Sequence, residues 1–377
     1  MILLSAPHIA GNEWHYVKDC LDTGWVSSVG AYVTKFENLV AEFSENKFGI
    51  AAVNGTAALH ISLQLNGVEL NDYVIVPNIT FIASCNAIKY TKARLILMDV
   101  DAQTWQMDLD LLTEFFETKT STNTDGVRIL KKNKRPIRAI MAVHVLGNMC
   151  DMDRLVTISE KYNVILIEDA TEALGSYYKG KHAGSFGKMA AFSFNGNKII
   201  TTGGGGVIVT NDEVLAKRAK HITTQAKCDP MEYMHDEVGY NYRLVNMLAA
   251  VGVAQMEQLP TFINRRKQID AYYKSELGHY SDIEFQKVEE NVNPNCWLFT
   301  FKTPKMRQLL THLNANGIQS RPFWVPMNQL PMFTKEIYLS KSDVSNSVYQ
   351  NCLSIPSSSF LTEADLEVVV KKVKEVL

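Results

Sequence analysis

The sequence predicts an α/β fold in which a large domain with a mostly parallel sheet precedes a smaller C-terminal α+β domain. The first observation is the length, because 377 residues exceed what one compact core usually holds. The second is that short apolar segments alternate with helical patterns between residues 48 and 210, as in βαβ units. The third is that most of these segments lack polar alternation, which is typical of strands buried on both faces. We expect the large domain at residues 1–250 and the small one at 251–377.

The expected strands and helices follow one another along the large domain. The expected strands are residues 50–53, 73–76, 94–99, 139–144, 164–168, 190–194 and 207–210, and helical patterns occur at 56–65 and 152–162. Residues 121–135 are polar and rich in lysine, which favours a solvated surface loop over a binding segment. Residues 245–259 predict a long helix that ends at Pro260 and crosses toward the second domain. Beyond it, residues 297–301 and the amphipathic stretch 363–377 mix strand and helix patterns, which predicts the α+β character.

The composition argues against several classes of protein. A formal net charge of −2 disfavours nonspecific binding to nucleic acid, although a local basic pocket for a small anion remains compatible with it. The six cysteines lie far apart without a CxxC pair, so neither a metal site nor a disulfide framework is indicated, and a reducing cytoplasm is expected. No signal-peptide pattern and no apolar stretch of about 18 residues occurs, so we expect neither secretion nor membrane insertion.

The most informative segment, residues 191–210, holds one lysine between two buried strands. It consists of a strand, a polar loop with Lys198, four glycines at 203–206 and a second strand. Taken alone, Lys198 would more often be a surface lysine, and the glycines a flexible turn. A lysine in a partly desolvated site, however, loses proton affinity and becomes a good amine nucleophile. That is what a Schiff base with an aldehyde cofactor requires.

Three further features are compatible with such a cofactor. A strand delivers Asp169 to its carboxyl end, where the carboxylate could pair with a protonated pyridine nitrogen or cap a helix. Residues 54–59 predict a sharp turn and a helix N-terminus that suits a phosphate, to which Ser193 can add a hydroxyl, or else an ordinary βα turn. Phe81 follows a strand and could stack on a flat ring or fill the core. In a parallel-sheet domain these parts together match pyridoxal phosphate.

In their joint occurrence and order, these motifs resemble the DegT/DnrJ/EryC1/StrS family of sugar aminotransferases over nearly the whole chain. The matching segments are residues 24–30 (GWVSSVG) with Phe36 and Glu37, 54–59 (NGTAAL), 168–175 (EDATEALG), 192–198 (FSFNGNK), 202–206 (TGGGG), 239–243 (GYNYR) and 320–322 (SRP). The resemblance implies the aspartate-aminotransferase type of fold, PLP fold type I, and pyridoxal 5′-phosphate as the cofactor.

The resemblance also implies roles for individual residues. Lys198 would bind the cofactor covalently and move a proton between cofactor and substrate carbon, Asp169 would hold the pyridinium, and Phe81 would stack on the ring. The remaining implied cofactor-binding residues are Gly55, Thr56, Ala57 and Ser193 at the phosphate, and Asn195 beside the lysine. Asn241 would reach the phosphate bound by the neighbouring subunit, so that a homodimer shares its active sites.

Two departures from the family pattern qualify these roles. The usual Gly-Glu-Gly-Gly is Gly203-Gly-Gly-Gly206 here, which removes a carboxylate. Many relatives carry Gln or His three residues after the aspartate, where this chain carries Glu172. A carboxylate that faces the phenolate oxygen of the cofactor would be repelled unless it is protonated or turned to another donor. We keep Glu172 as a predicted neighbour of the cofactor.

For the reaction, the resemblance implies amino transfer, with glutamate as donor, to C4 of a nucleotide-linked 4-keto-6-deoxy sugar. The first expected acceptor is UDP-linked 2-acetamido-4-keto-2,6-dideoxyglucose, as in the legionaminic acid pathway, and the alternative is GDP-linked 4-keto-6-deoxymannose, as in perosamine synthesis. Candidate sugar-binding residues are Trp25, Tyr32 and Arg321, which could equally be core aromatics and a surface ion pair. A non-catalytic regulator that binds the cofactor, or a related dehydratase with histidine in place of the lysine, is the other alternative, and Lys198 argues against both.

Overall fold

An eight-stranded central sheet forms the middle of the protein, whose computed structural model describes residues 1–229 and 231–377. Its strand order is β1-β11-β10-β7-β6-β2-β3-β18. The strands are β1 (Phe48–Ala52), β2 (Tyr73–Pro77), β3 (Arg94–Met98), β6 (Ile137–Val143), β7 (Ile165–Asp169), β10 (Met189–Ser193), β11 (Gly206–Thr210) and β18 (Ile337–Leu339). All neighbouring pairs are parallel except the two that involve β11. The prediction of a mostly parallel sheet is therefore confirmed.

The register of this sheet gathers its carboxyl ends at one edge. Asp169 at the end of β7 pairs with Ala191 of β10 and with Val143 of β6. Ser193 at the end of β10 pairs with Gly206, which also pairs with Ala52 of β1. Loops that follow these strands consequently begin side by side, and ligands of open α/β sheets bind at such an edge.

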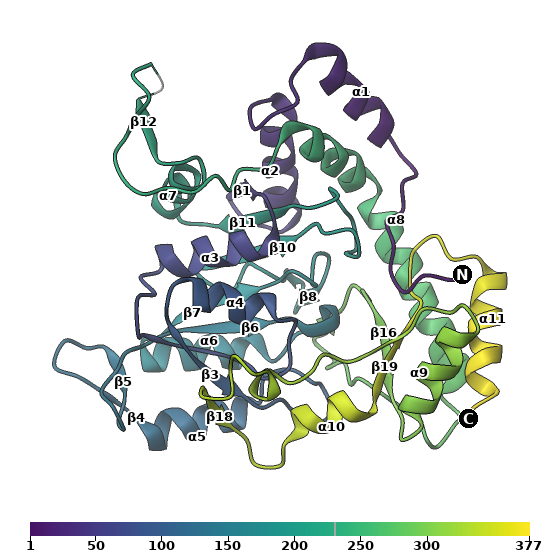
Figure 1. Ribbon diagram of the computed structural model, residues 1–377. Helices are drawn as coiled ribbons and strands as arrows, with labels where there is room; N and C mark the ends of the chain where they lie inside the picture. The colour runs from purple at the N-terminus through teal and green to yellow at the C-terminus, as the bar shows by residue number, and fades with distance from the viewer. Residues whose placement is uncertain (230) are drawn as a thin grey trace.

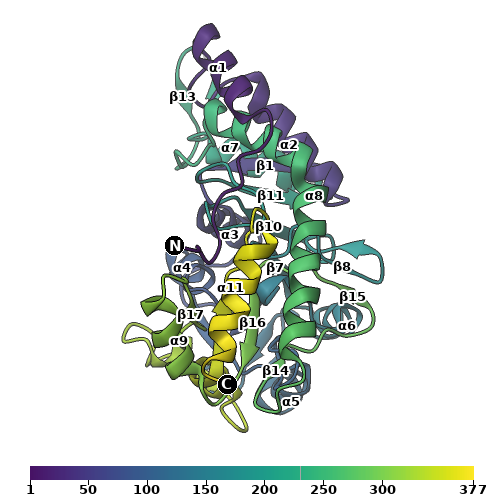
Figure 2. The ribbon, with the colours of Figure 1, turned by 90° about the vertical axis from the view of Figure 1, so that its right-hand side faces the viewer.

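Helices cover the sheet on both sides (Figures 1 and 2). They are α1 (Glu13–Thr23), α2 (Ala31–Phe43), α3 (Gly55–Leu65), α4 (Ala83–Tyr90), α5 (Leu109–Lys119), α6 (Met152–Tyr162), α7 (Glu213–Thr223), α8 (Asn246–Leu277), α9 (Met306–Ala315), α10 (Val344–Asn351) and α11 (Glu363–Lys374), with short 3₁₀ turns η1 (Val145–Gly147) and η2 (Met327–Gln329). Helix α3 packs on β10 and β11, and α1 and α2 pack on α8. No helix of residues 1–229 and 231–377 combines the length and apolarity that crossing a bilayer requires.

Helix α8 corrects one expectation, because it continues through Pro260 to Leu277. A proline inside a helix removes a hydrogen bond and costs about 3 kcal/mol. Both halves of α8 nevertheless bury apolar side chains, with Val253 in the core of the large sheet and Tyr273 in a second core. Burying one such side chain contributes about 1.5–3 kcal/mol, so several of them outweigh the defect at the proline.

The second core lies beneath a small antiparallel sheet of order β14-β16-β19-β17, which is covered by α9 and α11. Its strands are β14 (Glu284–Phe285), β16 (Phe299–Lys302), β17 (Arg321–Pro322) and β19 (Cys352–Ile355). Strand β18, although late in the chain, belongs to the large sheet beside β3. The predicted boundary at residue 250 falls inside α8, and where a domain division lies stays a prediction.

Residues 121–135 are not the loop that their composition suggests. They contribute to a two-stranded hairpin of β4 (Thr120–Thr122) and β5 (Arg128–Leu130). The Asn123 side chain accepts hydrogen bonds from the N–H groups of Asp125 and Val127 and so holds the turn. The remaining short strands are β8 (Tyr177–Tyr178), β9 (Lys181–His182), β12 (Lys227–Asp229), β13 (Met234–His235) and β15 (Val292–Asn293).

Candidate active site

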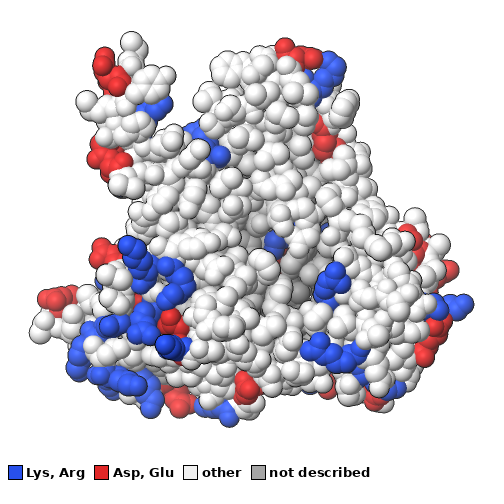
Figure 3. All heavy atoms as spheres, viewed as in Figure 1, with Lys and Arg blue, Asp and Glu red and all other residues white. Residues whose placement is uncertain are grey.

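A cavity of about 410 Å³ opens where the carboxyl edge of the large sheet meets the small sheet. Its floor comes from the turn before α3, the end of β7 and the loop after β10, and its walls come from residues 297–298 and 321–324. Figure 3 shows this face hollowed near its centre, with atoms of basic side chains deep inside. The site thus combines segments that are far apart in the sequence.

Lys198 lies in the loop between β10 and β11 and lines this cavity. Its backbone is held in place, because Asn197 O accepts hydrogen bonds from Ser5 Oγ at 2.8 Å and from Trp297 Nε1 at 2.7 Å. The Lys198 amine lies 4.1 Å from the centre of the Trp297 ring. Trp297 therefore both anchors the loop and covers one side of the amine.

Glu172 is the acidic partner of this amine. The Lys198 Nζ to Glu172 Oε1 distance is 3.7 Å, and the two side chains are only 12% and 3% exposed. Burial lowers the pKa of Lys198, against the opposing effect of Glu172 and Asp169. Burial also raises the pKa of Glu172 to about 7, although Lys198 works in the opposite direction. Burial thus shifts the amine toward its neutral form, which is the nucleophilic form of a lysine.

Asp169 ends β7 and is 2% exposed. Its carboxylate accepts hydrogen bonds from Ser84 Oγ at 2.6 Å and from Thr171 N at 3.2 Å. No helix begins at this aspartate in the described chain, so the alternative of a helix cap does not apply. The carboxylate lies beneath the cavity, whereas its neighbours Thr171 and Glu172 line it.

The turn before α3 supplies hydrogen-bond donors to the other end of the cavity. Gly55, Thr56 and Ser193 line it, and the first N–H groups of a helix have no partner within the helix. The Ala57 N–H is different, because it donates to Asn54 Oδ1 at 2.8 Å. A Cβ on Gly55 would lie 2.9 Å from the Ser193 Cβ, so only glycine lets the two segments approach this closely.

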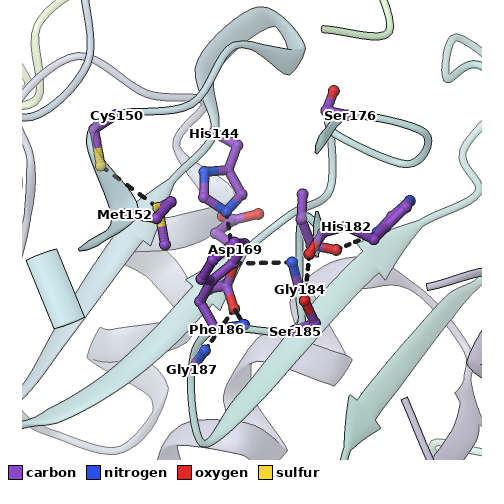
Figure 4. A network of polar contacts seen from close by, with 12 residues as sticks. His144, Cys150, Met152, Asp169, Ser176, His182, Gly184, Ser185, Phe186 and Gly187 are labelled. Carbon is purple, nitrogen blue, oxygen red and sulfur yellow. Dashed lines mark hydrogen bonds and ion pairs between the residues drawn. The ribbon is translucent and has the colours of Figure 1, made fainter. Parts of the chain in front are cut away.

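A buried network of hydrogen bonds stabilises the strand ends that form this floor (Figure 4). The Glu168 carboxylate is fully buried and accepts hydrogen bonds from His144 Nε2 at 2.9 Å and from the N–H groups of Gly184, Phe186 and Gly187 at 2.6–2.8 Å. Burial alone would raise the pKa of Glu168, but these donors hold it below its usual value. The network joins β7 to the segment that leads into β10, and so holds together the two strands that carry Asp169 and Ser193.

The other predicted residues divide into two groups. Phe81, Asn195 and Arg321 line the cavity, and Phe81 meets Trp324 edge to face at 6.3 Å between ring centres. Trp25, Tyr32 and Asn241 do not line it. Tyr32 packs against Tyr16, and burial raises the pKa of its hydroxyl to about 12. Trp25 and Asn241 are exposed, and Asn241 forms a backbone bridge to Thr224.

Several lining residues escaped the sequence analysis. They are Leu4, Asn197, Trp297, Leu298, Phe323 and Trp324. Asn197 lies within the motif at residues 192–198 and Phe323 directly follows the motif at residues 320–322, so both positions carried a usable signal. Leu4 and Trp297 carried no such signal, because they reach the cavity only through the packing of distant segments. Gly204 lines the cavity, and a Cβ added there would have no other heavy atom within 4 Å.

The chemistry of these donors fits pyridoxal 5′-phosphate. An aldehyde cofactor needs an amine that loses its proton readily, and Lys198 meets that need through burial. A phosphate needs several N–H and O–H donors at one place, and the hydroxyls of Ser193 and Thr56 have no hydrogen-bond partner within the described structure. Asp169 provides the buried carboxylate that a protonated ring nitrogen requires.

Comparison with known proteins agrees with this geometry. The model of the DegT/DnrJ/EryC1/StrS aminotransferase family matches residues 7–374. GDP-perosamine synthase of Escherichia coli O157:H7 is 37% identical over 98% of this chain and 96% of its own length. UDP-4-amino-4,6-dideoxy-N-acetyl-beta-L-altrosamine transaminase of Campylobacter jejuni is 29% identical over 94% of this chain and 90% of its own.

Solved structures share the fold. DesV of S. venezuelae superimposes with a TM-score of 0.86 at 28% identity, over 97% of this chain and 94% of that one. The PLP form of Spr1654 from Streptococcus pneumoniae gives a TM-score of 0.87 at 23% identity, over 99% and 98%. From the family match and the curated relatives it follows that the chain belongs to the DegT/DnrJ/EryC1/StrS aminotransferase family and is a sugar aminotransferase that depends on pyridoxal 5′-phosphate.

Proposed function

We propose that this enzyme transfers an amino group from glutamate to C4 of a nucleotide-linked 4-keto-6-deoxy sugar. The observation that carries the proposal is the buried Lys198 amine, which lies 3.7 Å from Glu172 in a cavity with Gly55, Thr56 and Ser193 among its lining residues. Arg321, on the wall formed by the small sheet, adds a cationic group suited to an anionic nucleotide. The free cysteines agree with the reducing cytoplasm that we propose as its location.

Pyridoxal phosphate supplies an aldehyde that takes up and returns the amino group, and a ring that withdraws electrons. Lys198 would hold it covalently through Nζ, and the same amine would move a proton to and from the substrate carbon in both half-reactions. Asp169 would pair with the protonated ring nitrogen. Gly55, Thr56 and Ser193 bind the phosphate, and Phe81 covers the ring face. Trp297 excludes water from one side of the amine.

Two acceptors are proposed. The first is UDP-linked 2-acetamido-4-keto-2,6-dideoxyglucose, which the motif resemblance supports. The name of the Campylobacter jejuni relative supports a UDP-linked N-acetylated 4-amino-4,6-dideoxy sugar, although it names an L-altrosamine. The second is GDP-linked 4-keto-6-deoxymannose, which is supported by GDP-perosamine synthases of 32–37% identity from Escherichia coli, Caulobacter vibrioides and Vibrio cholerae. The nucleotide and hexose contacts come from dispersed loop residues, so the relatives' overall identity does not by itself rank the two.

Incubation of the holoenzyme with glutamate and a panel of UDP- and GDP-linked 4-keto sugars tests this proposal. We expect one 4-keto-6-deoxy sugar to release 2-oxoglutarate in equal amount to the amino sugar formed, as read by mass spectrometry. The matched 4-hydroxy sugars serve as controls and should release none. Absence of turnover with every 4-keto sugar, in protein that carries the cofactor, would contradict the proposed function.

We further propose that the active site is shared between the subunits of a homodimer. Asn241 lies outside the cavity of its own chain and is exposed, as are the nearby apolar side chains of Tyr233 and Val238. Trp14 of α1 is also exposed, and Figure 1 places α1 and the β12 hairpin at the same end of the molecule. Exposed apolar side chains concentrated at one end suit an interface between subunits.

For this shared site, Asn241→Ala is expected to weaken cofactor retention about tenfold or more, because a hydrogen bond to a charged phosphate contributes about 1.5–3 kcal/mol. Mixing tests the arrangement. A heterodimer of Lys198→Ala and Asn241→Ala subunits has one site with both lesions and one intact site, so exchanged subunits should regain part of the activity. If verified heterodimers are no more active than the parent variants, Asn241 acts within its own subunit.

A further inference from the structure

We propose that Lys198 and Glu172 hold a single proton between them near neutral pH, so that Glu172 governs when the lysine is a neutral amine. The inference deepens the role of Lys198 and therefore rests on the proposed function. It assigns a positioning and proton-holding role to Glu172, a residue at which the sequence departs from the expected motif.

The geometry isolates one carboxylate oxygen for the lysine. Glu172 Oε2 accepts the N–H of Leu146 at 2.8 Å, which fixes the carboxylate in place. Oε1 is then the atom that faces Lys198 Nζ, 3.7 Å away. The backbone is held as well, because Asn295 Nδ2 donates to Glu172 O at 2.8 Å. Glu172 is thus held at its backbone carbonyl and at Oε2, which leaves Oε1 facing the amine.

Few charged groups act on this pair. Lys198 from the loop after β10 and Asp169 from the end of β7 are the charged groups that influence Glu172, and η1 contributes only the Leu146 N–H. Glu172 and Asp169 are likewise the groups that influence Lys198. On the remaining side the amine faces the Trp297 ring. The proton balance therefore depends on one amine and two carboxylates, of which Asp169 has its own donors in Ser84 and Thr171.

Burial brings the two proton affinities together. It lowers the pKa of Lys198 and raises that of Glu172 to about 7. Both shifts favour the proton on the carboxyl group, whereas the attraction between ammonium and carboxylate opposes them. Moving the proton breaks an N–H bond and forms an O–H bond, and the pair stays neutral overall. Loss of this proton would leave a second buried anion near Asp169, which is unfavourable. Coupled groups of this kind lose their protons in two separate steps that belong to the pair.

This arrangement also resolves the repulsion expected of a glutamate beside the cofactor. As a carboxylic acid, Glu172 can donate a hydrogen bond to an anionic oxygen, which a carboxylate cannot do. A glutamine at this position could also donate, but it could not take up the proton that Lys198 gives away. Glu172 can therefore accept a proton from Lys198 and return it within the buried part of the site.

Competitive labelling of the apoprotein tests the pair without relying on catalysis. Trace acetic anhydride is applied from about pH 5 to about pH 10, and the acetylated fraction of Lys198 is measured by peptide mass spectrometry. We expect the wild-type reactivity to rise in two steps. In Glu172→Gln it should rise in one step and reach its maximum about one pH unit or more earlier, because no anion then stabilises the ammonium. Glu172→Asp keeps a carboxylate and should keep two steps.

Glu336→Gln is the matched control, since Glu336 pairs with Lys89 at 2.8 Å away from the cavity. It should leave the labelling profile of Lys198 unaltered. Identical Lys198 profiles in wild type and Glu172→Gln, both with native circular dichroism, would overturn the inference. If Glu172→Gln does not fold, the wild type alone still decides. A wild-type Lys198 reactivity that rises with pH in a single step would also overturn the inference. A two-step profile in a protein without aminotransferase activity would support the pair and contradict only the proposed function.

Discussion

Replacement of Lys198 by alanine is expected to abolish both half-reactions, with a loss of at least about 10³-fold in turnover. Covalent binding and proton transfer depend on one amine, and general acid–base catalysis alone contributes about 10²- to 10⁴-fold. In the structure, Glu172 is the acidic partner and Trp297 the covering ring of that amine. The variant should fold normally, because the loop is held by hydrogen bonds from Ser5 and Trp297 to the Asn197 carbonyl. The substitution does not remove these bonds.

Two measurements check this expectation. Stopped-flow spectra of each half-reaction give the rates, and borohydride reduction followed by peptide mapping shows where the cofactor is attached. The attachment should map to Lys198 in the wild type and disappear in Lys198→Ala. Lys132→Ala, at an exposed lysine outside the cavity, is the control and should retain full activity. Attachment to any other lysine would refute the assignment.

Replacement of Asp169 by asparagine is expected to lower the rates of both half-reactions by about 10²-fold or more while the protein stays folded. An opposite charge beside a protonated nitrogen typically shifts its pKa by one to three units, and an amide cannot provide that stabilisation. The amide can still accept the hydrogen bond from Ser84 Oγ, which contacts Asp169 at 2.6 Å. The variant should therefore keep its fold and lose the stabilisation of the protonated, electron-withdrawing ring.

A pH titration of the bound cofactor's absorbance separates this effect from misfolding. Asp169→Asn should show ring deprotonation at lower pH than the wild type, with a native melting transition. Ser84→Ala removes a hydrogen bond but keeps the carboxylate, so it should cost far less activity. Equal rates for the wild type and Asp169→Asn would show that this carboxylate does not face the ring nitrogen.

Much of the candidate site could be predicted because it is built on the parallel sheet. Apolar segments and short turns indicated which residues end each strand, and parallel strands bring their carboxyl ends to one edge. That reasoning is enough to bring Asp169, Ser193 and the turn at Gly55 together, and the register of β1, β11, β10 and β7 does so. The lysine loop follows directly after β10, so its place near that edge was predictable too.

Elements governed by distant packing were not predictable in this way. Pro260 indicated a helix end, but buried side chains on both halves of α8 carry the helix through it. The polarity of residues 121–135 indicated a loop, yet Ile129 and Leu130 are buried and a hairpin forms. Strand β18 joins the large sheet from the last part of the chain. For α8 and β18 the deciding contacts involve partners far away in the sequence, whereas the two strands of the hairpin pair locally.

By itself the sequence determined the class of fold, the resemblance to an aminotransferase family and the residues at the sheet edge, because these depend on local pattern and strand polarity. Only the tertiary structure decided which groups surround the Lys198 amine. Trp297 reaches it from about a hundred residues away, and Glu172 faces it because Leu146 and Asn295 hold that acid in place. Proton affinity in a buried site depends on such neighbours and on lost hydration, which are properties of packing in three dimensions.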